Sequence, residues 1–230
     1  ACKDIRLSLY RVTKSIMTLS KQNYEDRKAF FNERAQEWLD MWYADQATGA
    51  YTKFNREFLR LFSLVPIKQG DHVLDVGCGS GVLVPYIMEK ISFTGSLYEI
   101  DYAEEMIREN KRLHHHPRIH FLVSDAAAIP LQSNTCSLAI CFCSFPHFPE
   151  KARVINTVAR LLTRNGCLAI AHFSSSQELN HHHRKSNKAV MHDMLPDRAS
   201  MRRLFTSAGI TVETVIDEPQ FYLFLGKKTN

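Results

Sequence analysis

Beyond Gly70 the chain alternates short apolar runs with segments whose apolar residues recur at helical spacing. This order is typical of a sheet of parallel strands with helices on both faces. Only residues 217–220 separate the last two runs, too few for a crossover, so we expect these strands to pair antiparallel. We predict an α/β fold with a doubly wound, seven-stranded sheet that is mostly parallel and has one antiparallel C-terminal strand. The expected strands are 72–76, 96–100, 119–124, 138–142, 167–173, 210–216 and 221–225, and the expected helices are 82–91, 103–113, 151–162 and 198–208.

The residues before this region form a basic leader and an aromatic segment. Residues 1–23 hold five Lys or Arg and one acid, with apolar residues at roughly helical spacing. We expect a helix packed on its own domain or, as the alternative, a basic amphipathic helix that binds an anionic partner. Residues 24–64 are helical in pattern and rich in aromatic residues. We therefore divide the chain into an N-terminal helical extension or lid, residues 1–64, and a main domain, residues 65–230.

The composition excludes several classes of protein. No window of 18 residues lacks charged or strongly polar side chains, so we expect no membrane span. The six cysteines form no C-x-x-C pair and no secretory signal is recognisable, so we expect free thiols and a cytoplasmic protein. The net charge of +5 is too small to indicate a nucleic-acid partner.

Three glycines, Gly77, Gly79 and Gly81, lie within five residues at the end of the first expected strand. In an open parallel sheet this strand-to-helix turn lies beside the ligand crevice, and glycine lets a ligand approach the backbone closely. The third glycine comes one residue too early for a dinucleotide fingerprint, and the Lys of a phosphate-binding P-loop is missing. The alternative is a loop that only packs a helix against a strand.

An acid stands at the end of each of the first three expected strands: Asp75, Asp101 and Asp125. A carboxylate at the first strand end would repel a pyrophosphate, by about 4 kcal/mol at 4 Å for an effective dielectric near 20. An acid at the second strand end is placed to accept ribose hydroxyls, and Asp125 with Ala126 is placed to meet an adenine edge. These three acids favour a cationic nucleoside as the ligand.

The run Val73–Gly81 resembles the first motif of the class I S-adenosylmethionine-dependent methyltransferases. Asp101 with Ala103 and Met106 resembles the ribose-binding segment of that family, and residues 124–126 resemble its adenine-binding segment. Residues 160–168 resemble the turn before its fifth strand. The resemblance covers about residues 66–173, with Cys136-Ser137 and Asn165-Gly166 departing from the usual Phe-Asp and Pro-Gly.

The resemblance implies a Rossmann-like fold with S-adenosyl-L-methionine as cofactor. It also implies a set of cofactor-binding residues along the ends of the first four strands. These are Asp75, Gly77, Cys78, Gly79, Gly81, Asp101, Tyr102, Met106, Asp125, Ala126, Cys141 and Phe142.

His147 follows the fourth expected strand, in a stretch that lies against the methionine half of the cofactor in the resembled family. A His there is a candidate general base; the alternative is a His that only lines the pocket or caps the next helix. The aromatic residues Tyr24, Phe31, Trp38 and Tyr43 either wall the site or form a helical core.

The polar segment 172–184 replaces a short connection, and in the resembled family such insertions shape the acceptor site. Its His-rich part contacts the acceptor, is simply solvated, or contributes to a nitrogen-rich metal site, and we predict no bound metal. The predicted acceptor pocket consists of Trp38, His147, His172, Asn180 and His183.

The sequence therefore predicts an S-adenosylmethionine-dependent methyltransferase that acts on a small-molecule acceptor by direct displacement. A methyltransferase of macromolecules is the second possibility, although the sequence after the fourth strand lacks the Asn/Asp-Pro-Pro-aromatic motif of base methylation. A cofactor- or metal-binding protein without turnover is the third. The acceptor atom and the oligomeric state are not predicted.

Overall fold

The computed structural model describes residues 22–229, so the basic leader lies almost entirely outside the described residues. Within this range the chain forms a seven-stranded sheet in the order β3-β2-β1-β4-β5-β7-β6. Strand β7 is antiparallel to both of its neighbours, whereas the other strand pairs are parallel. The predicted fold class is confirmed. The strands are β1 (His72–Val76), β2 (Ser96–Asp101), β3 (Ile119–Val123), β4 (Cys136–Phe142), β5 (Leu162–His172), β6 (Ile210–Glu218) and β7 (Phe221–Lys228).

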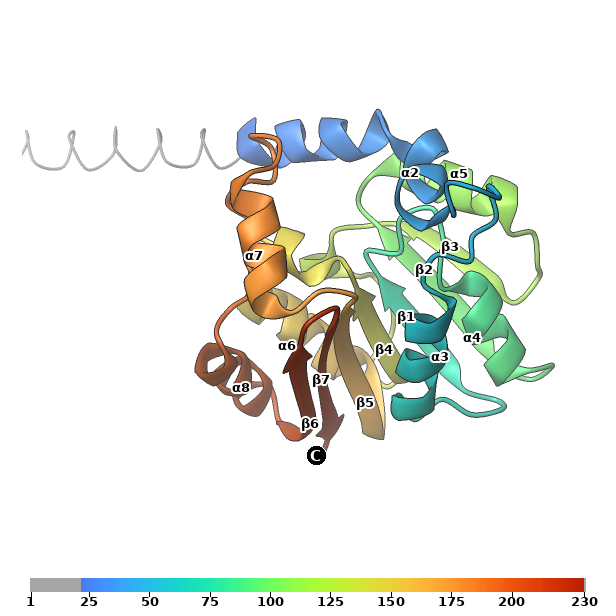
Figure 1. Ribbon diagram of the computed structural model, residues 1–230. Helices are drawn as coiled ribbons and strands as arrows, with labels where there is room; N and C mark the ends of the chain where they lie inside the picture. Colours follow the sequence, from blue (N-terminus) through green and yellow to red (C-terminus); the bar gives the residue numbers. More distant parts are fainter. Residues whose placement is uncertain (1–21, 230) are drawn as a thin grey trace, which may run out of the picture.

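Helices cover both faces of the sheet (Figure 1). Apolar side chains alternate along the buried strands, so that Val73 packs on one face and Leu74 on the other. Helices α3 (Asn55–Leu64), α4 (Val84–Ile91) and α5 (Glu104–Leu113) lie on one side, and α6 (Lys151–Leu161) and α8 (Arg198–Ser207) on the other. Three short 3₁₀ turns complete the core elements: η1 (Ala35–Glu37), η2 (Ala126–Ala128) and η3 (Phe145–His147).

The polar segment after β5 contains a helix, α7 (Ser176–Arg184), that we did not predict. Ser175 accepts a hydrogen bond from the Glu178 amide, and the Glu178 carboxylate accepts one from the Ser175 amide, forming a capping box. The pair Ser175-x-x-Glu178 is readable in the sequence as a helix start. The helix has no strong apolar face, which is why periodicity alone did not indicate it.

A helical segment at residues 22–32 runs across the carboxyl ends of the strands, followed by η1 and α2 (Trp38–Tyr43). Asn32 accepts a hydrogen bond of 3.0 Å from the Glu105 amide, and Lys28 pairs with Glu104 at 2.7 Å. These contacts fix the segment to the start of α5. None of the helices between residues 22 and 229 is long and apolar enough to cross a membrane.

Helix α3 packs on the sheet through an aromatic cluster centred on Phe58. The Phe58 ring lies 4.5 Å from that of Tyr86, 5.5 Å from Phe142 and 4.7 Å from Phe173, measured between centroids. Since Phe142 ends β4, this cluster fixes the position of the chain that continues into η3.

Replacing Phe58 with alanine tests the contribution of this cluster. Phe58 is 2% exposed, so Phe58→Ala should lower the free energy of unfolding by about 3–5 kcal/mol through lost burial and a residual cavity. Its neighbour Leu59 is 70% exposed, so Leu59→Ala should change stability by about 0.5 kcal/mol or less. Denaturant-induced unfolding measures both, and equal effects would contradict the packing role.

Candidate active site

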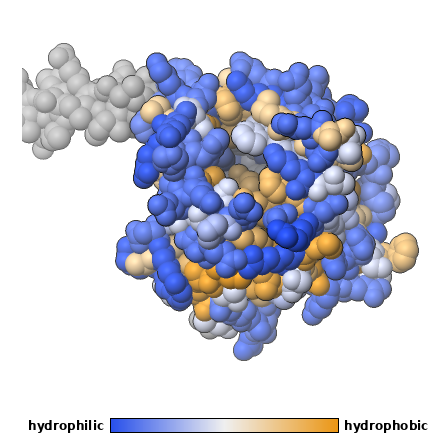
Figure 2. Space-filling model, viewed as in Figure 1, coloured by the Kyte–Doolittle hydropathy of each residue, from blue (hydrophilic) through white to orange (hydrophobic). Residues whose placement is uncertain are grey.

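The sheet order places a ligand site at the carboxyl end of β1. Strand β1 lies between β2 and β4: the chain runs outward from β1 to β2 and β3 and then returns to the other side of β1 as β4, so the strand order reverses there, which is the switch point where open α/β sheets bind ligands. A cavity of about 920 Å³, including its open mouth, lies there. Figure 2 shows the hollow below the helical segment at residues 22–32, with apolar side chains inside it.

The cavity extends along the ends of β1, β2 and β4 and is covered by residues of the helical extension. From the predicted cofactor set it is lined by Asp75, Gly77, Cys78, Gly79, Asp101, Tyr102, Met106, Asp125, Ala126 and Phe142. Gly81 and Cys141 do not line it. Cys141 is buried within β4.

The glycines of the loop have different roles. Gly77 has a φ of +75°, and a Cβ there would lie 2.4 Å from the Ser144 Cβ, so the loop fits only without a side chain. At Gly81 a Cβ would lie 2.3 Å from Asn110 Oδ1, which shows that this glycine lets α5 pack closely. Gly79 faces the cavity, with the Trp38 indole as its nearest neighbour. The loop therefore combines both predicted roles: Gly79 faces the space for a ligand, and Gly81 allows close packing of a helix.

A cluster of buried acids lies beneath the loop. Asp101 accepts hydrogen bonds from the Gly79 amide at 3.0 Å and the Ala103 amide at 2.9 Å. Glu99 is fully buried and accepts a 2.6 Å bond from Asn110, but its Oε1 has no partner. Oδ1 of the buried Asp75 has no partner either. The described residues thus place three carboxyl groups together without a neighbouring cation.

Burial in this cluster shifts the carboxyl pKa values upward. Loss of hydration raises the pKa of Asp101 to about 6, against the lowering effect of the amides that it accepts from. Burial likewise raises the pKa of Glu99 to about 8. The pKa of Asp75 lies well above its usual value because it is buried and faces Glu99 and Asp101. A cationic ligand would relieve this cost.

Glu99 was not predicted as part of the site. It lies two residues before Asp101, so both side chains are on the same face of β2. The signal was present in the sequence, since an acid in the middle of a strand expected to be buried needs a partner or a function.

At the third strand end, Asp125 accepts a 2.7 Å hydrogen bond from the Ala127 amide and so caps η2. Tyr24 of the helical segment lies against this acid, and burial together with Asp125 raises the pKa of Tyr24 to about 12. The Tyr24 ring also packs against the Tyr102 ring, with 5.2 Å between the ring centroids. Residues of the extension therefore close the cavity at this end.

The four aromatic residues predicted either to wall the site or to form a helical core all line the cavity: Tyr24, Phe31, Trp38 and Tyr43. Phe31 contacts Trp38 at 5.6 Å between ring centroids and the His147 ring at 5.1 Å. Phe31 and Tyr43 are also almost fully buried. These aromatic residues therefore form part of the cavity wall, and Phe31 and Tyr43 also belong to the hydrophobic core.

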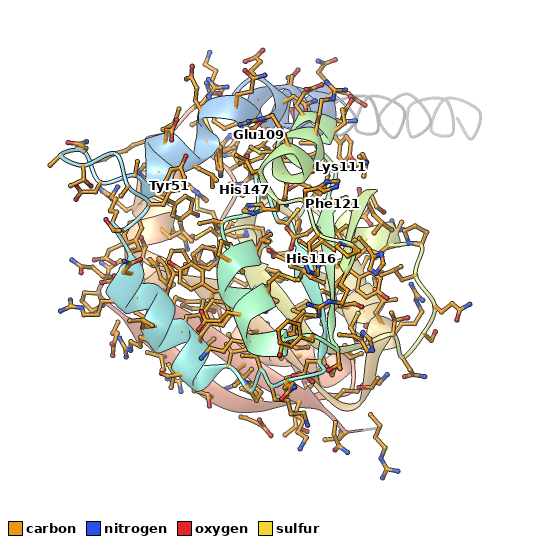
Figure 3. The ribbon with its side chains drawn as sticks, turned by 90° about the vertical axis from the view of Figure 1, so that its right-hand side faces the viewer. Tyr51, Glu109, Lys111, His116, Phe121 and His147 are labelled. Atoms are coloured by element: carbon orange, nitrogen blue, oxygen red, sulfur yellow. The ribbon has the colours of Figure 1, made fainter. Side chains whose placement is uncertain are left out.

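The predicted acceptor residues separate into three groups. Trp38 and His147 line the cavity, and Figure 3 shows His147 in the interior below the helical segment. His183 packs against His147 at 5.1 Å between rings, and His172 is buried at the end of β5, but neither lines the cavity. Asn180 exchanges two hydrogen bonds with the Leu195 backbone outside the cavity wall. Within residues 22–229, no group of three His, Cys, Asp or Glu side chains is arranged to hold a metal ion.

The donor set fits S-adenosylmethionine, which carries an ammonium, a sulfonium, a ribose and an adenine. The orphaned Oδ1 of Asp75, which lines the cavity, suits the ammonium group, and Asp101 and Asp125 lie where acids would accept from the nucleoside. When bound, this cofactor supplies an electrophilic methyl group. The chain's own contribution is to position the cofactor and the methyl acceptor and to exclude water.

Comparison with known proteins agrees with this geometry. The sequence model of the family described as "Methyltransferase domain" matches residues 67–216. The chain is 27% identical over 200 residues to a malonyl-[acyl-carrier protein] O-methyltransferase of Marinomonas sp., covering 80% of this chain and 73% of the relative. It is 27% identical to a ubiquinone biosynthesis O-methyltransferase of Coxiella burnetii, covering 66% and 64% of the two chains.

Among solved structures, a SAM-dependent methyltransferase from Aquifex aeolicus superposes with a TM-score of 0.67 at 19% identity, covering 86% of this chain and 98% of the other. At that identity the likeness shows the fold alone. The match to the family model spans more than half of the residues and contains the glycine loop and the acids. The chain belongs to the methyltransferase domain family and is a class I S-adenosylmethionine-dependent methyltransferase.

Proposed function

We propose that the chain transfers the methyl group by direct displacement to a small-molecule acceptor bound in the same cavity. The observation that carries this proposal is the coverage of the cavity by the helical extension. Tyr24, Phe31, Trp38 and Tyr43 line the cavity and belong to the segment that crosses the strand ends in Figure 1, so the cavity is partly covered and suits a small molecule. The names of the two relatives, both O-methyltransferases, are consistent with it.

The acceptor end of the cavity is the end near β4. The acids that suit the cofactor lie at the ends of β1, β2 and β3, whereas Phe142, Cys143 and His147 lie at the end of β4 or just after it. These residues, with Trp38 and Tyr43 above them, form a largely apolar and aromatic wall. We infer that the acceptor is apolar or aromatic near the reacting atom.

In this proposal the N-terminal helical extension, residues 1–64, acts as a lid on the domain formed by residues 65–230. Helix α3 belongs to that extension by sequence but packs into the core of the sheet. The covering role therefore falls to residues 22–43. We also propose a reducing, cytoplasmic location, since the five described cysteines are unpaired and four of them are buried.

Methyl transfer from radiolabelled S-adenosylmethionine to a fractionated cell extract tests the acceptor class. Calorimetry should first show that the protein binds the cofactor. Label should then enter the low-molecular-mass fraction, because the covered cavity favours a small acceptor. Label in the protein or nucleic-acid fraction alone would contradict the small-molecule proposal, and cofactor binding without any labelled product would favour a protein that has lost turnover.

The buried acids predict a pH dependence of stability. In the unfolded chain Glu99 titrates near 4.3, so between that pH and about 8 the folded state holds more protons and unfolding becomes easier as pH rises. Between about pH 6.5 and 8 the unfolding free energy should fall by up to about 1.4 kcal/mol per pH unit for each such proton. Glu99→Gln should make this fall smaller, and saturating S-adenosylmethionine should also reduce it.

Glu89→Gln is the matched control, since Glu89 is exposed on α4. Thermal unfolding of the three proteins at pH 6.5, 7.25 and 8 measures the slopes. A slope that is the same in Glu99→Gln and wild type would show that Glu99 is ionised already in the folded protein.

A further inference from the structure

Asp193 and His147 form a hydrogen-bonded pair at the edge of the cavity. His147 ends η3 and lines the cavity, whereas Asp193 lies in the segment between α7 and α8. Asp193 Oδ2 is 2.8 Å from His147 Nδ1, and the Asp193 side chain is 6% exposed. The pair joins residues that are 46 positions apart in the sequence, and nothing in the sequence pattern indicated it.

The ionisation of Asp193 defines the tautomer of His147. Burial alone would raise the pKa of Asp193, but hydrogen bonds and charges from His147 and Arg27 outweigh it and hold that pKa below its usual value. An ionised carboxylate only accepts hydrogen bonds, so Nδ1 of His147 carries the proton. In the neutral ring the lone pair is then on Nε2, which forms no hydrogen bond within the described residues.

The pair is held rigidly from several sides. Arg27 of the helical segment donates to both oxygens of Asp193, from Nε at 2.9 Å and from Nη2 at 2.8 Å. Lys151 donates to the carbonyls of Pro146 and Phe148, each at 2.9 Å, and so fixes the backbone on both sides of His147. The imidazole is therefore oriented by its hydrogen bond and by its backbone together.

The other titratable groups near His147 do not compete for its proton. The charge of Arg27 is balanced by Asp193. Burial lowers the pKa of His183 and lowers that of His172 to about 3, so both rings are neutral at neutral pH. Burial lowers the pKa of Lys151 to about 8, and its ammonium is directed at two carbonyls.

We propose that Asp193 is a positioning residue that holds His147 as the general base, and that the acceptor carries a hydroxyl group that arrives protonated. This inference rests on the proposed function. A hydroxyl oxygen is a weak nucleophile until it loses its proton, whereas an uncharged amine attacks through a free lone pair. The acceptor O–H bond breaks and its proton passes to Nε2, while the oxygen electron pair forms the bond to the methyl carbon. The electron pair of the broken carbon–sulfur bond stays on sulfur.

Nitrogen-15 NMR of histidine-labelled full-length protein tests the tautomer without any turnover. The wild-type spectrum should show His147, assigned by its absence in His147→Gln, with the proton on Nδ1. In Asp193→Asn the side-chain amide can donate to Nδ1, so the proton should move to Nε2. Asp197→Asn is the control, because Asp197 only caps α8 and asparagine caps equally well. A wild-type ring protonated on Nε2 would overturn the inference.

Two phenols test the base. At about pH 8, 4-nitrophenol is largely ionised and 4-methylphenol is not, so only the second needs a base. Asp193→Asn should reduce kcat for 4-methylphenol about 100-fold with little change in KM, and should reduce kcat for 4-nitrophenol much less. Asp197→Asn should affect neither. An equal loss with both phenols would show a merely structural role and overturn the inference.

The methylated atom of the product formed from the low-molecular-mass extract decides the acceptor class, including the case in which neither phenol is used. Methylation of a hydroxyl oxygen supports the inference, whereas methylation of a carboxylate oxygen, which arrives ionised and needs no base, overturns it. Methylation of nitrogen or sulfur overturns it but leaves the proposed function standing, whereas label confined to macromolecules refutes the proposed function itself.

Discussion

Asp101 accepts hydrogen bonds from the amides of Gly79 and Ala103, and this one carboxylate joins the glycine loop after β1 to the start of α5. The loop held at that junction also contacts its surroundings: Ser80 donates to the Met106 sulfur, and Gly79 faces Trp38 of the helical extension. Because the carboxylate is buried beside two other acids, the junction is also electrostatically costly. The buried carboxyl groups that shape the site therefore lack a neighbouring positive charge among the described residues, and a bound cation would compensate for this.

The cavity has two chemically different walls, one acidic and one aromatic, and both suit a bound cation. Acids and backbone amides follow β1, β2 and β3, and aromatic rings come from the extension and from the end of β4. A low-dielectric aromatic cover strengthens every charge interaction beneath it and keeps out water. In a methyltransferase these two effects serve the binding of a cation and the protection of its methyl group.

The sequence predicted the parts of this structure that depend on local patterns. Strand and helix order followed from apolar periodicity, and the acids at the strand ends followed from the topology of a parallel sheet. Asp75, Asp101 and Asp125 accordingly line the cavity. Glu99 was not predicted, although an acid inside a strand expected to be buried is itself a signal, because only acids at strand ends follow from the topology of the sheet.

The contacts between distant segments could not be predicted. Asp193 meets His147 across 46 positions and Arg27 across 166, and no spacing rule brings such residues together. Asn180 was expected in the acceptor pocket because it lies one helical turn from His183. The structure instead shows its amide paired with the Leu195 backbone, which is set by the path of the chain after α7.

Ser80 within the glycine loop donates a 2.8 Å hydrogen bond to the carbonyl of Ala35 in the extension. The loop that faces one ligand and the segment that covers both are thus joined by a buried polar contact. Displacement of the extension breaks this bond, so in the proposed function the release of the used cofactor is linked to the opening of the acceptor space. If the extension acts as the proposed lid, each turnover contains an opening step, and its rate depends on residues such as Ser80 and Ala35 that touch neither reacting atom.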